Sequence, residues 1–227
     1  METHELDGWT IIFDLDGTLV DSAPDLHAAL NDCLTRSGYD PVAFDLIHGM
    51  IGEGAKAMIR KALTHQGEQV SETVVDDLWG DFLNHYRENL CHLSSLYPGV
   101  ETALDEIAAA GATLAVCTNK PQALSEAVLS GFGIFERFAA IVGADAVPDK
   151  KPNGDHVLEA LRRAGGDQRR SMMIGDSQID ERAARNAGLP FVFAPFGYGP
   201  EPVDLSKVSG VYETYGDLPG LIRAIRF

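Results

Sequence analysis

The sequence predicts an α/β fold: a Rossmann-like parallel sheet with helices on both faces, plus an inserted helical-bundle domain. Short apolar stretches alternate with helical patterns through the second half of the chain, which is typical of a parallel sheet covered on both faces. Residues 25–93 instead carry helical periodicity and few strand signals. We therefore expect a core made of residues 1–20 and 97–227, and a four-helix insert made of residues 21–96.

The first predicted strand, residues 10–13, is apolar or β-branched and runs directly into two carboxylates. Asp14 and Asp16 are two positions apart, so an extended chain points both to the same side. Gly17 then allows a sharp turn. An Asp-x-Asp-Gly string also occurs in ordinary turns and in calcium loops. The preceding strand and the apolar pair that follows at residues 19–20 disfavour the calcium loop.

The insert begins with Ser22, which we expect to cap a helix that carries Pro24 and Asp25 in its first turn. Apolar residues then repeat at helical spacing through the insert, and we interpret its Trp, Met and Phe side chains as core packing. The residues that carry this periodicity are Leu26, Leu30, Cys33, Leu34, Ala55, Met58, Ile59, Leu63, Val75, Leu78, Trp79, Phe82, Leu83 and Tyr86.

A glycine-rich connection at residues 49–54 leads into a helix with a basic turn. Lys56 and Arg60 lie one turn apart on that helix. In so acidic a chain, a helix start of this kind can hold an anion, although a solvated helix face explains the same residues equally well. Under the first interpretation the substrate contacts are Gly52, Glu53, Lys56 and Arg60.

After a turn at residues 97–100, strands and helices alternate. Helices are predicted over residues 101–110, 122–130, 155–164 and 178–187. Strands are predicted over residues 113–117, 139–142, 171–174 and 191–193, the last of which we take as the final strand.

Polar side chains follow three of these strands: Thr118 and Asn119, then Lys151, then Asp176 with Asp180. The carboxyl ends of parallel strands share one edge of the sheet, so we expect these groups to meet Asp14 and Asp16 there. We expect His156, a little further on, to lie at the surface.

Carboxylates gathered at that edge predict a metal ion. Asp14, Asp16 and Asp176 cannot be buried together as bare anions without a large cost. A hard divalent cation removes the cost, and ligands that are all oxygen favour Mg²⁺. No cluster of histidines and cysteines competes for the metal.

The amino-acid composition limits the classes of partner that the protein can bind. The 227 residues are 45% hydrophobic and 23% charged, which is ordinary for a soluble globular protein. The formal charge of −16 disfavours a nucleic-acid partner, whereas an anionic small substrate would need local positive charge. No apolar run is long enough for a membrane span, and no signal pattern begins the chain. The three widely spaced cysteines indicate reduced thiols, so we expect a cytoplasmic protein.

Four motifs in order resemble the haloacid dehalogenase-like superfamily. They are FDLDGT at residues 13–18, CTN at residues 117–119, KP at residues 151–152 and GDSQID at residues 175–180. The resemblance runs from about residue 9 to residue 199. Further segments are similar to the phosphoglycolate-phosphatase-like branch of that superfamily: residues 20–24, 52–54, 97–100, 117–121 and 197–199.

The resemblance implies roles for the motif residues. Asp14 would be the nucleophile that forms an aspartyl-phosphate. Asp16 would protonate the leaving alcohol and then activate water. Thr118 would bind a phosphoryl oxygen, and Lys151 would offset the charge of nucleophile and phosphate.

The same resemblance implies the remaining contacts. Asp14, Asp16 through its backbone carbonyl, and Asp176 would hold Mg²⁺, with Asp180 in the same acidic set orienting metal-bound water or Lys151. Thr18 and Asn119 belong to the expected substrate-binding residues. The insert resembles the helical cap that closes over the site, reads the substrate and excludes water.

The implied activity is a Mg²⁺-dependent phosphomonoesterase, with 2-phosphoglycolate as the best single substrate. Alternatives are a phosphatase for another sugar phosphate, a nucleotide or pyrophosphate, a phosphomutase, or a phosphonatase that uses Lys56. Dehalogenase and P-type ATPase chemistry do not fit the acid at position 16, and the intact motifs argue against a non-catalytic binding module. We expect a monomer or a homodimer. One departure concerns residues 153–155, where branch members often carry a second proline after the KP pair.

Overall fold

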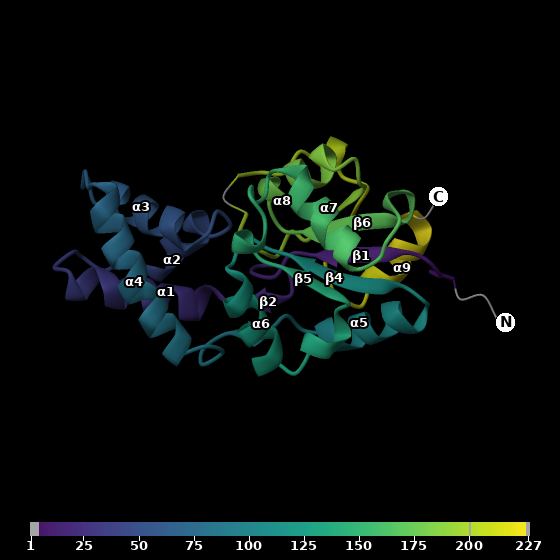
Figure 1. The fold of residues 1–227 in the computed structure, drawn as a ribbon, viewed down its shortest axis with the longest axis horizontal. Coiled ribbons are helices and arrows are strands. Elements are labelled where there is room, and N and C mark those ends of the chain that lie inside the picture. Colours follow the sequence, from purple (N-terminus) through teal and green to yellow (C-terminus); the bar gives the residue numbers. More distant parts are fainter. Residues whose placement is uncertain (1–4, 200, 226–227) are drawn as a thin grey trace.

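The computed structural model describes residues 5–199 and 201–225. Its core is a six-stranded parallel sheet in the order β5-β4-β1-β6-β7-β8, as the sequence predicts for an α/β fold (Figure 1). The strands are β1 (Thr10–Phe13), β4 (Thr113–Cys117), β5 (Ala140–Val142), β6 (Ser171–Gly175), β7 (Phe191–Phe193) and β8 (Gly210–Val211). The short edge strand β8 lies beyond the segment that we expected to be the last strand.

Strand β1 is central because its residues are apolar on both faces. Ile11 and Phe13 face one layer of core side chains, and Ile12 faces the other. The first layer is covered by α5 (Val100–Ala109), α6 (Gln122–Gly131) and α9 (Leu218–Ile225), and the second by α7 (Gly154–Arg163) and α8 (Gln178–Asn186). A strand buried on both faces needs neighbours on both edges, and β1 has β4 and β6.

Four helices between β2 and β3 form a second lobe with its own apolar core (Figure 1). They are α1 (Ala23–Arg36), α2 (Phe44–Ile47), α3 (Ala55–His65) and α4 (Glu72–Glu88). The strands β2 (Val20–Asp21) and β3 (Ser95–Leu96) pair antiparallel and carry the chain into and out of this lobe. We propose that this ribbon is the domain boundary, with residues 21–96 as the cap.

Five short 3-10 helices complete the secondary structure of the described residues: η1 (His48–Met50), η2 (Phe135–Arg137), η3 (Ala144–Ala146), η4 (Gln168–Arg170) and η5 (Leu205–Lys207). Within residues 5–199 and 201–225, no helix is both long and apolar enough to cross a membrane. The three cysteines are unbridged.

The expected helix cap at Ser22 is wrong in its chemistry. Ser22 does precede α1, but its side chain accepts no hydrogen bond from that helix. Its hydroxyl instead donates to Asp16 Oδ1 at 2.6 Å. The serine therefore joins the start of the cap to the end of β1.

The departure at residues 153–155 has a packing reason. Asn153 caps α7 by accepting a hydrogen bond from the Asp155 N–H at 2.9 Å. The next residue, Gly154, lies against the end of α8, where a Cβ atom would come within 2.5 Å of backbone atoms of Asn186 and Ala187. A proline at position 154 would meet the same backbone, so the close approach of α7 to α8 requires glycine.

Asp25 connects the two ends of the cap through hydrogen bonds. Its carboxylate is buried and accepts hydrogen bonds from the Leu93 N–H (2.8 Å), the Ser94 N–H (3.0 Å) and the Ser94 hydroxyl (2.5 Å). These donors lie just before β3, so the first turn of α1 holds the segment that returns to the core.

We expect Asp25→Ala to lower the free energy of unfolding by about 2–4 kcal/mol, because three donors lose the buried carboxylate that accepts their hydrogen bonds. Urea unfolding measures this change. The exposed Asp149 offers a matched control, and Asp149→Ala should stay within about 0.5 kcal/mol of the parent protein. A parent-like midpoint for Asp25→Ala would contradict the connecting role.

Candidate active site

A buried ammonium joins two carboxylates at the carboxyl end of the sheet. Lys151 Nζ lies 2.8 Å from Asp14 Oδ1 and 2.7 Å from Asp180 Oδ1. The side chain of Lys151 is 1% exposed, so both ion pairs are shielded from water. Burial would lower the pKa of Lys151, but the two carboxylates outweigh it and hold that pKa above its ordinary value. Lys151 is therefore a fixed positive charge beside Asp14.

Asp176, at the end of β6, is held by groups from elsewhere in the chain. The Thr18 hydroxyl donates to its Oδ1 at 3.0 Å, and the Tyr198 N–H donates to its Oδ2 at 2.7 Å. Gly17 and Gly197 leave room for the carboxylate, since a Cβ on either would come within 2.4 Å of Asp176 Oδ2. Thr18 is fully buried, and its expected contact with substrate stays a prediction.

The acidic cluster fits a divalent cation. Carboxylate oxygens of Asp14, Asp176 and Asp180 lie within 4.8 Å of one another, and all three residues are buried. Burial, together with the charge of Asp180, raises the pKa of Asp14 to about 7 even though Lys151 opposes the shift. Burial and the two neighbouring carboxylates also raise the pKa of Asp176 well above its ordinary value. Both carboxylates are therefore costly to ionise in this buried site, and a cation with oxygen ligands such as Mg²⁺ would offset that cost.

Asp180 has both oxygens engaged in the protein. One accepts from Lys151, and the other accepts from the Ser177 N–H at 3.1 Å and the Ser177 hydroxyl at 2.5 Å. Ser177 and Asp180 form a capping box at the start of α8. The expected role of Asp180, to orient metal-bound water or Lys151, stays a prediction.

Thr118 and Asn119 follow β4 and face the same edge of the sheet. Thr118 is 1% exposed, and its hydroxyl accepts the Lys120 N–H at 3.1 Å. The amide nitrogen of Asn119 donates to the carbonyls of Gly52 and Lys151 at 3.0 Å each, so it ties the cap to the lysine loop. Among the described residues, the buried Oδ1 of Asn119 has no hydrogen-bond partner.

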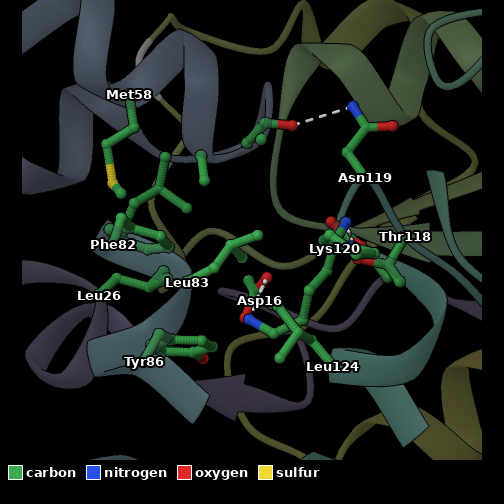
Figure 2. A pocket seen from close by; sticks show the side chains of 16 residues that line it. Asp16, Leu26, Met58, Phe82, Leu83, Tyr86, Thr118, Asn119, Lys120 and Leu124 are labelled. Atoms are coloured by element: carbon green, nitrogen blue, oxygen red, sulfur yellow. Dashed lines mark hydrogen bonds and ion pairs between the residues drawn. The ribbon is translucent and has the colours of Figure 1, made fainter. Parts of the chain in front are cut away.

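A cavity of about 50 Å³ lies between cap and core above these groups. Figure 2 shows its two unlike sides. The core contributes all the charged side chains, and its lining residues are Asp14, Asp16, Thr118, Asn119, Lys120, Pro121 and Leu124. The cap contributes apolar side chains from three helices and one loop: Leu26, Ile51, Ala55, Met58, Phe82, Leu83 and Tyr86. A ligand in this cavity would thus meet charge on one side and hydrocarbon on the other.

Asp16 is paired with a lysine that our sequence analysis did not select. Lys120 Nζ lies 2.9 Å and 3.1 Å from the two carboxylate oxygens of Asp16 (Figure 2). Burial would lower the pKa of Lys120, but Asp16 and Tyr86 together outweigh it and hold that pKa above its ordinary value. A usable signal existed, because Lys120 stands two positions after Thr118 at a strand end, where alternate residues share a side.

The basic turn of the cap lies in ion pairs with α4. Lys56 Nζ is 2.5 Å from Asp76 Oδ1 and lies over the Trp79 ring, and Arg60 pairs with Glu72. Neither basic residue lines the cavity that holds Asp14 and Asp16, and their expected substrate contact stays a prediction.

Gly52 and Glu53 lie just before α3, and their surroundings differ from those of Lys56 and Arg60. Gly52 lines the cavity, and its carbonyl accepts from Asn119. The Glu53 side chain pairs with Lys61 at 2.8 Å, and its carbonyl accepts from Lys150 at 2.5 Å.

His156 is fully buried, so its expected position at the surface is wrong. The Lys151 N–H donates to its Nδ1 at 3.1 Å, and its Nε2 lies 3.1 Å from the Val142 carbonyl oxygen. Since Nδ1 accepts a hydrogen bond and the carbonyl can only accept one, the ring is neutral with its proton on Nε2. Burial and the nearby Lys151 ammonium lower the pKa of His156 to about 4. His156 thus fixes the loop that carries Lys151.

A family model, curated sequences and solved structures all show similarity to this chain. A family model described as haloacid dehalogenase-like hydrolase matches residues 11–194. Phosphoglycolate phosphatase from Caulobacter vibrioides is 42% identical over 95% of this chain and 91% of its own length. The enzyme of the same name from Agrobacterium fabrum is also 42% identical, over 85% of this chain and 82% of its own. A crystal structure titled a predicted phosphoglycolate phosphatase, from Haemophilus somnus, has a TM-score of 0.86 at 31% identity and covers 97% of this chain and 99% of its own.

The buried neutral His156 predicts a pH dependence of stability. Its pKa is about 4 in the folded chain against 6.5 ordinarily, so the unfolded chain binds the proton more readily. The stability that neutral His156 contributes is present above pH 6.5 and is lost as the pH falls toward 4. Between pH 7 and pH 5 the loss amounts to about 2 kcal/mol.

Unfolding of the parent and of His156→Gln at both pH values measures this contribution. The variant should lose about 2 kcal/mol less stability than the parent on acidification. His65→Gln, which changes an exposed histidine, should follow the parent. Equal pH dependence in all three proteins would contradict the neutral, buried state.

Proposed function

Because the chain belongs to the haloacid dehalogenase-like hydrolase family, we propose that it is a Mg²⁺-dependent phosphomonoesterase acting on a small phosphorylated metabolite, best represented by 2-phosphoglycolate. One observation carries the proposal. Asp14 lies at the end of β1, buried and fixed 2.8 Å from Lys151, with the cavity above it and Asp16 two residues further on. A nucleophile, a fixed cation and a second carboxylate are the groups that two-step phosphoryl transfer through an aspartate requires.

In the first step, Asp14 attacks the phosphorus of the substrate, and the bond from phosphorus to the leaving oxygen breaks. The product on the enzyme is an aspartyl-phosphate. Asp16 gives its proton to the leaving oxygen, which departs as a neutral alcohol. Lys151 lies 2.8 Å from Asp14, and Thr118 lines the same cavity as Asp14. Both can stabilise negative charge on the phosphoryl oxygens.

In the second step, Asp16 takes a proton from a water molecule that attacks the phosphorus of the aspartyl-phosphate. The bond from phosphorus to Asp14 breaks, phosphate leaves, and both carboxylates return to their starting state. The apolar side of the cavity, which includes Met58 and Phe82, keeps other water away from the aspartyl-phosphate.

Asp14 and Asp176, assisted by the Asp16 backbone carbonyl, are the residues that would hold Mg²⁺, and Asp180 would support them through Lys151. The bound ion would neutralise charge on the carboxylates and the phosphoryl group.

The small cavity supports a small leaving group, and the names of the relatives support 2-phosphoglycolate among such substrates. A compact sugar phosphate is the alternative that the same cavity would accept most readily after rearrangement of the cap. We further propose a cytoplasmic protein acting as a monomer or a homodimer. Its three unbridged cysteines support a reducing compartment.

Replacing the nucleophile tests the mechanism. Asp14→Asn should lower kcat for phosphate release from 2-phosphoglycolate by at least about 10⁴-fold, because an amide cannot form the acyl-phosphate. Phosphate release in the presence of Mg²⁺, with and without EDTA, is the measurement. Circular dichroism checks folding, and Asp149→Asn serves as the exposed control. Activity of Asp14→Asn within tenfold of the parent would rule out this nucleophile.

Binding of the ion can be tested without turnover. At a Mg²⁺ concentration of 100 times Kd, binding should stabilise the folded chain by about 2.7 kcal/mol, which raises Tm by about 5–10 °C. Asp176→Asn should abolish most of the shift, since it removes one carboxylate of the cluster. Asp204→Asn, which changes a remote exposed carboxylate, should keep the shift. An undiminished shift in Asp176→Asn would contradict the assigned ligand.

A further inference from the structure

The cavity has one ammonium group on the side where the leaving group must lie. We propose that Lys120 is a specificity-determining residue that binds a carboxylate carried by the leaving group. This inference rests on the proposed phosphatase activity and adds the residue that selects the substrate.

Lys120 is placed by both the core and the cap. It follows β4, is 5% exposed, and lies 2.9 Å and 3.1 Å from the oxygens of Asp16. Its Nζ also sits 4.7 Å from the ring centroid of Tyr86, which belongs to cap helix α4. An ammonium has three N–H donors, so contact with one carboxylate leaves donor capacity for a ligand. The lysine is therefore held in place before substrate binds.

No other lysine or arginine among the described residues lines this cavity. The basic residues of the cap that drew attention in the sequence, Lys56 and Arg60, are paired with acids of α4. Around Lys120 the walls are hydrocarbon, from Leu83 and Leu124 among others (Figure 2). A charge–charge contact is stronger in such surroundings than in water, so a single ammonium can discriminate between ligands.

The chemistry of the reaction fixes where a carboxylate would fall. In 2-phosphoglycolate one methylene separates the leaving oxygen from the carboxylate. Asp16 must reach the leaving oxygen to protonate it. Lys120 contacts Asp16, so its ammonium would lie within reach of a carboxylate that is one methylene away from the leaving oxygen.

The site already contains an ammonium shared between two carboxylates. Lys151 contacts Asp14 at 2.8 Å and Asp180 at 2.7 Å. Lys120 would likewise lie between Asp16 and the substrate. In the reacting complex Asp16 carries the proton that it gives to the leaving oxygen, so the substrate carboxylate supplies the negative charge that Lys120 balances. A carboxylate suits this position better than a second phosphoryl group, because one ammonium balances a single negative charge and the cavity is small.

The test compares two substrates that differ in this charge. 2-Phosphoglycolate carries the carboxylate, and 2-hydroxyethyl phosphate has a neutral hydroxymethyl group in its place. Lys120→Met keeps an unbranched side chain, one atom shorter, and removes the ammonium. We expect kcat/KM for 2-phosphoglycolate to fall roughly 100-fold more than kcat/KM for 2-hydroxyethyl phosphate, mainly through KM. Lys120→Arg should restore part of the preference.

The ratio of the two substrates separates recognition from structure. Loss of the Asp16 contact or of folding would lower activity on both substrates alike. Lys207→Met, which makes the same change at an exposed ion pair, should leave both values at the parent level. If Lys120→Met turns over too slowly to measure, calorimetric binding of both compounds to Asp14→Asn and to the double variant gives the same comparison.

An equal fall for both substrates, or an equal loss of binding, would overturn the assignment of Lys120. So would a shift of the substrate ratio in Lys56→Met but not in Lys120→Met, which would assign recognition to the basic turn of the cap. A parent enzyme that hydrolyses other phosphates but not 2-phosphoglycolate would overturn the proposed substrate and this inference together. That failure is visible before any variant is made.

Discussion

The structure depends on one buried ammonium shared by two carboxylates at the end of the central strand. Lys151 comes from the loop after β5, Asp14 from the end of β1 and Asp180 from the first turn of α8. Buried charges of this kind are tolerated only when each has partners in good geometry. The sheet supplies that geometry, because β5, β4, β1 and β6 lie in this order, run parallel and end at one edge. The capping box of Ser177 and the buried ring of His156 then fix the two loops that carry Asp180 and Lys151.

The link between this centre and the cap runs through a few polar contacts. Tyr198 donates its N–H to Asp176, and its hydroxyl donates to Asp21 of β2 and accepts the N–H of Ala23 at the start of α1. Ser22 and Lys120 both bind Asp16. The entry of the cap is therefore tied to the same carboxylates that are proposed to do the chemistry. A change in the position of the cap would change the surroundings of Asp16 and Asp176 together.

Much of this centre follows from local sequence. Strands at residues 113–117 and 191–193 were predicted at their observed bounds, because each is a short apolar run between turns. Asp14, Thr118 and Asp176 were predicted to meet because parallel strands end at one edge, and the structure brings them there. For Lys120 the local pattern offers only its position two residues after Thr118, and its partner Asp16 lies 104 positions away.

Other features can be explained only from the folded structure. His156 stands on an exposed-looking helix start, yet the loop of Lys151 closes over it. Ser22 has the residue type of a helix cap but finds a stronger partner in Asp16. Gly154 and Gly197 are set by the close approach of segments distant in sequence, which composition does not record. The residues proposed to bear the chemistry were thus predictable from spacing, whereas those that position them were not.

The proposed account centres on a covalent bond between Asp14 and phosphorus. Rapid acid quenching of the enzyme during turnover of 2-phosphoglycolate, followed by mass spectrometry of its peptides, tests this bond directly. The account predicts a peptide containing Asp14 that is heavier by one phosphoryl group and that returns to its original mass when substrate is exhausted. Steady release of phosphate with no phosphorylated Asp14 peptide at any quench time would contradict it.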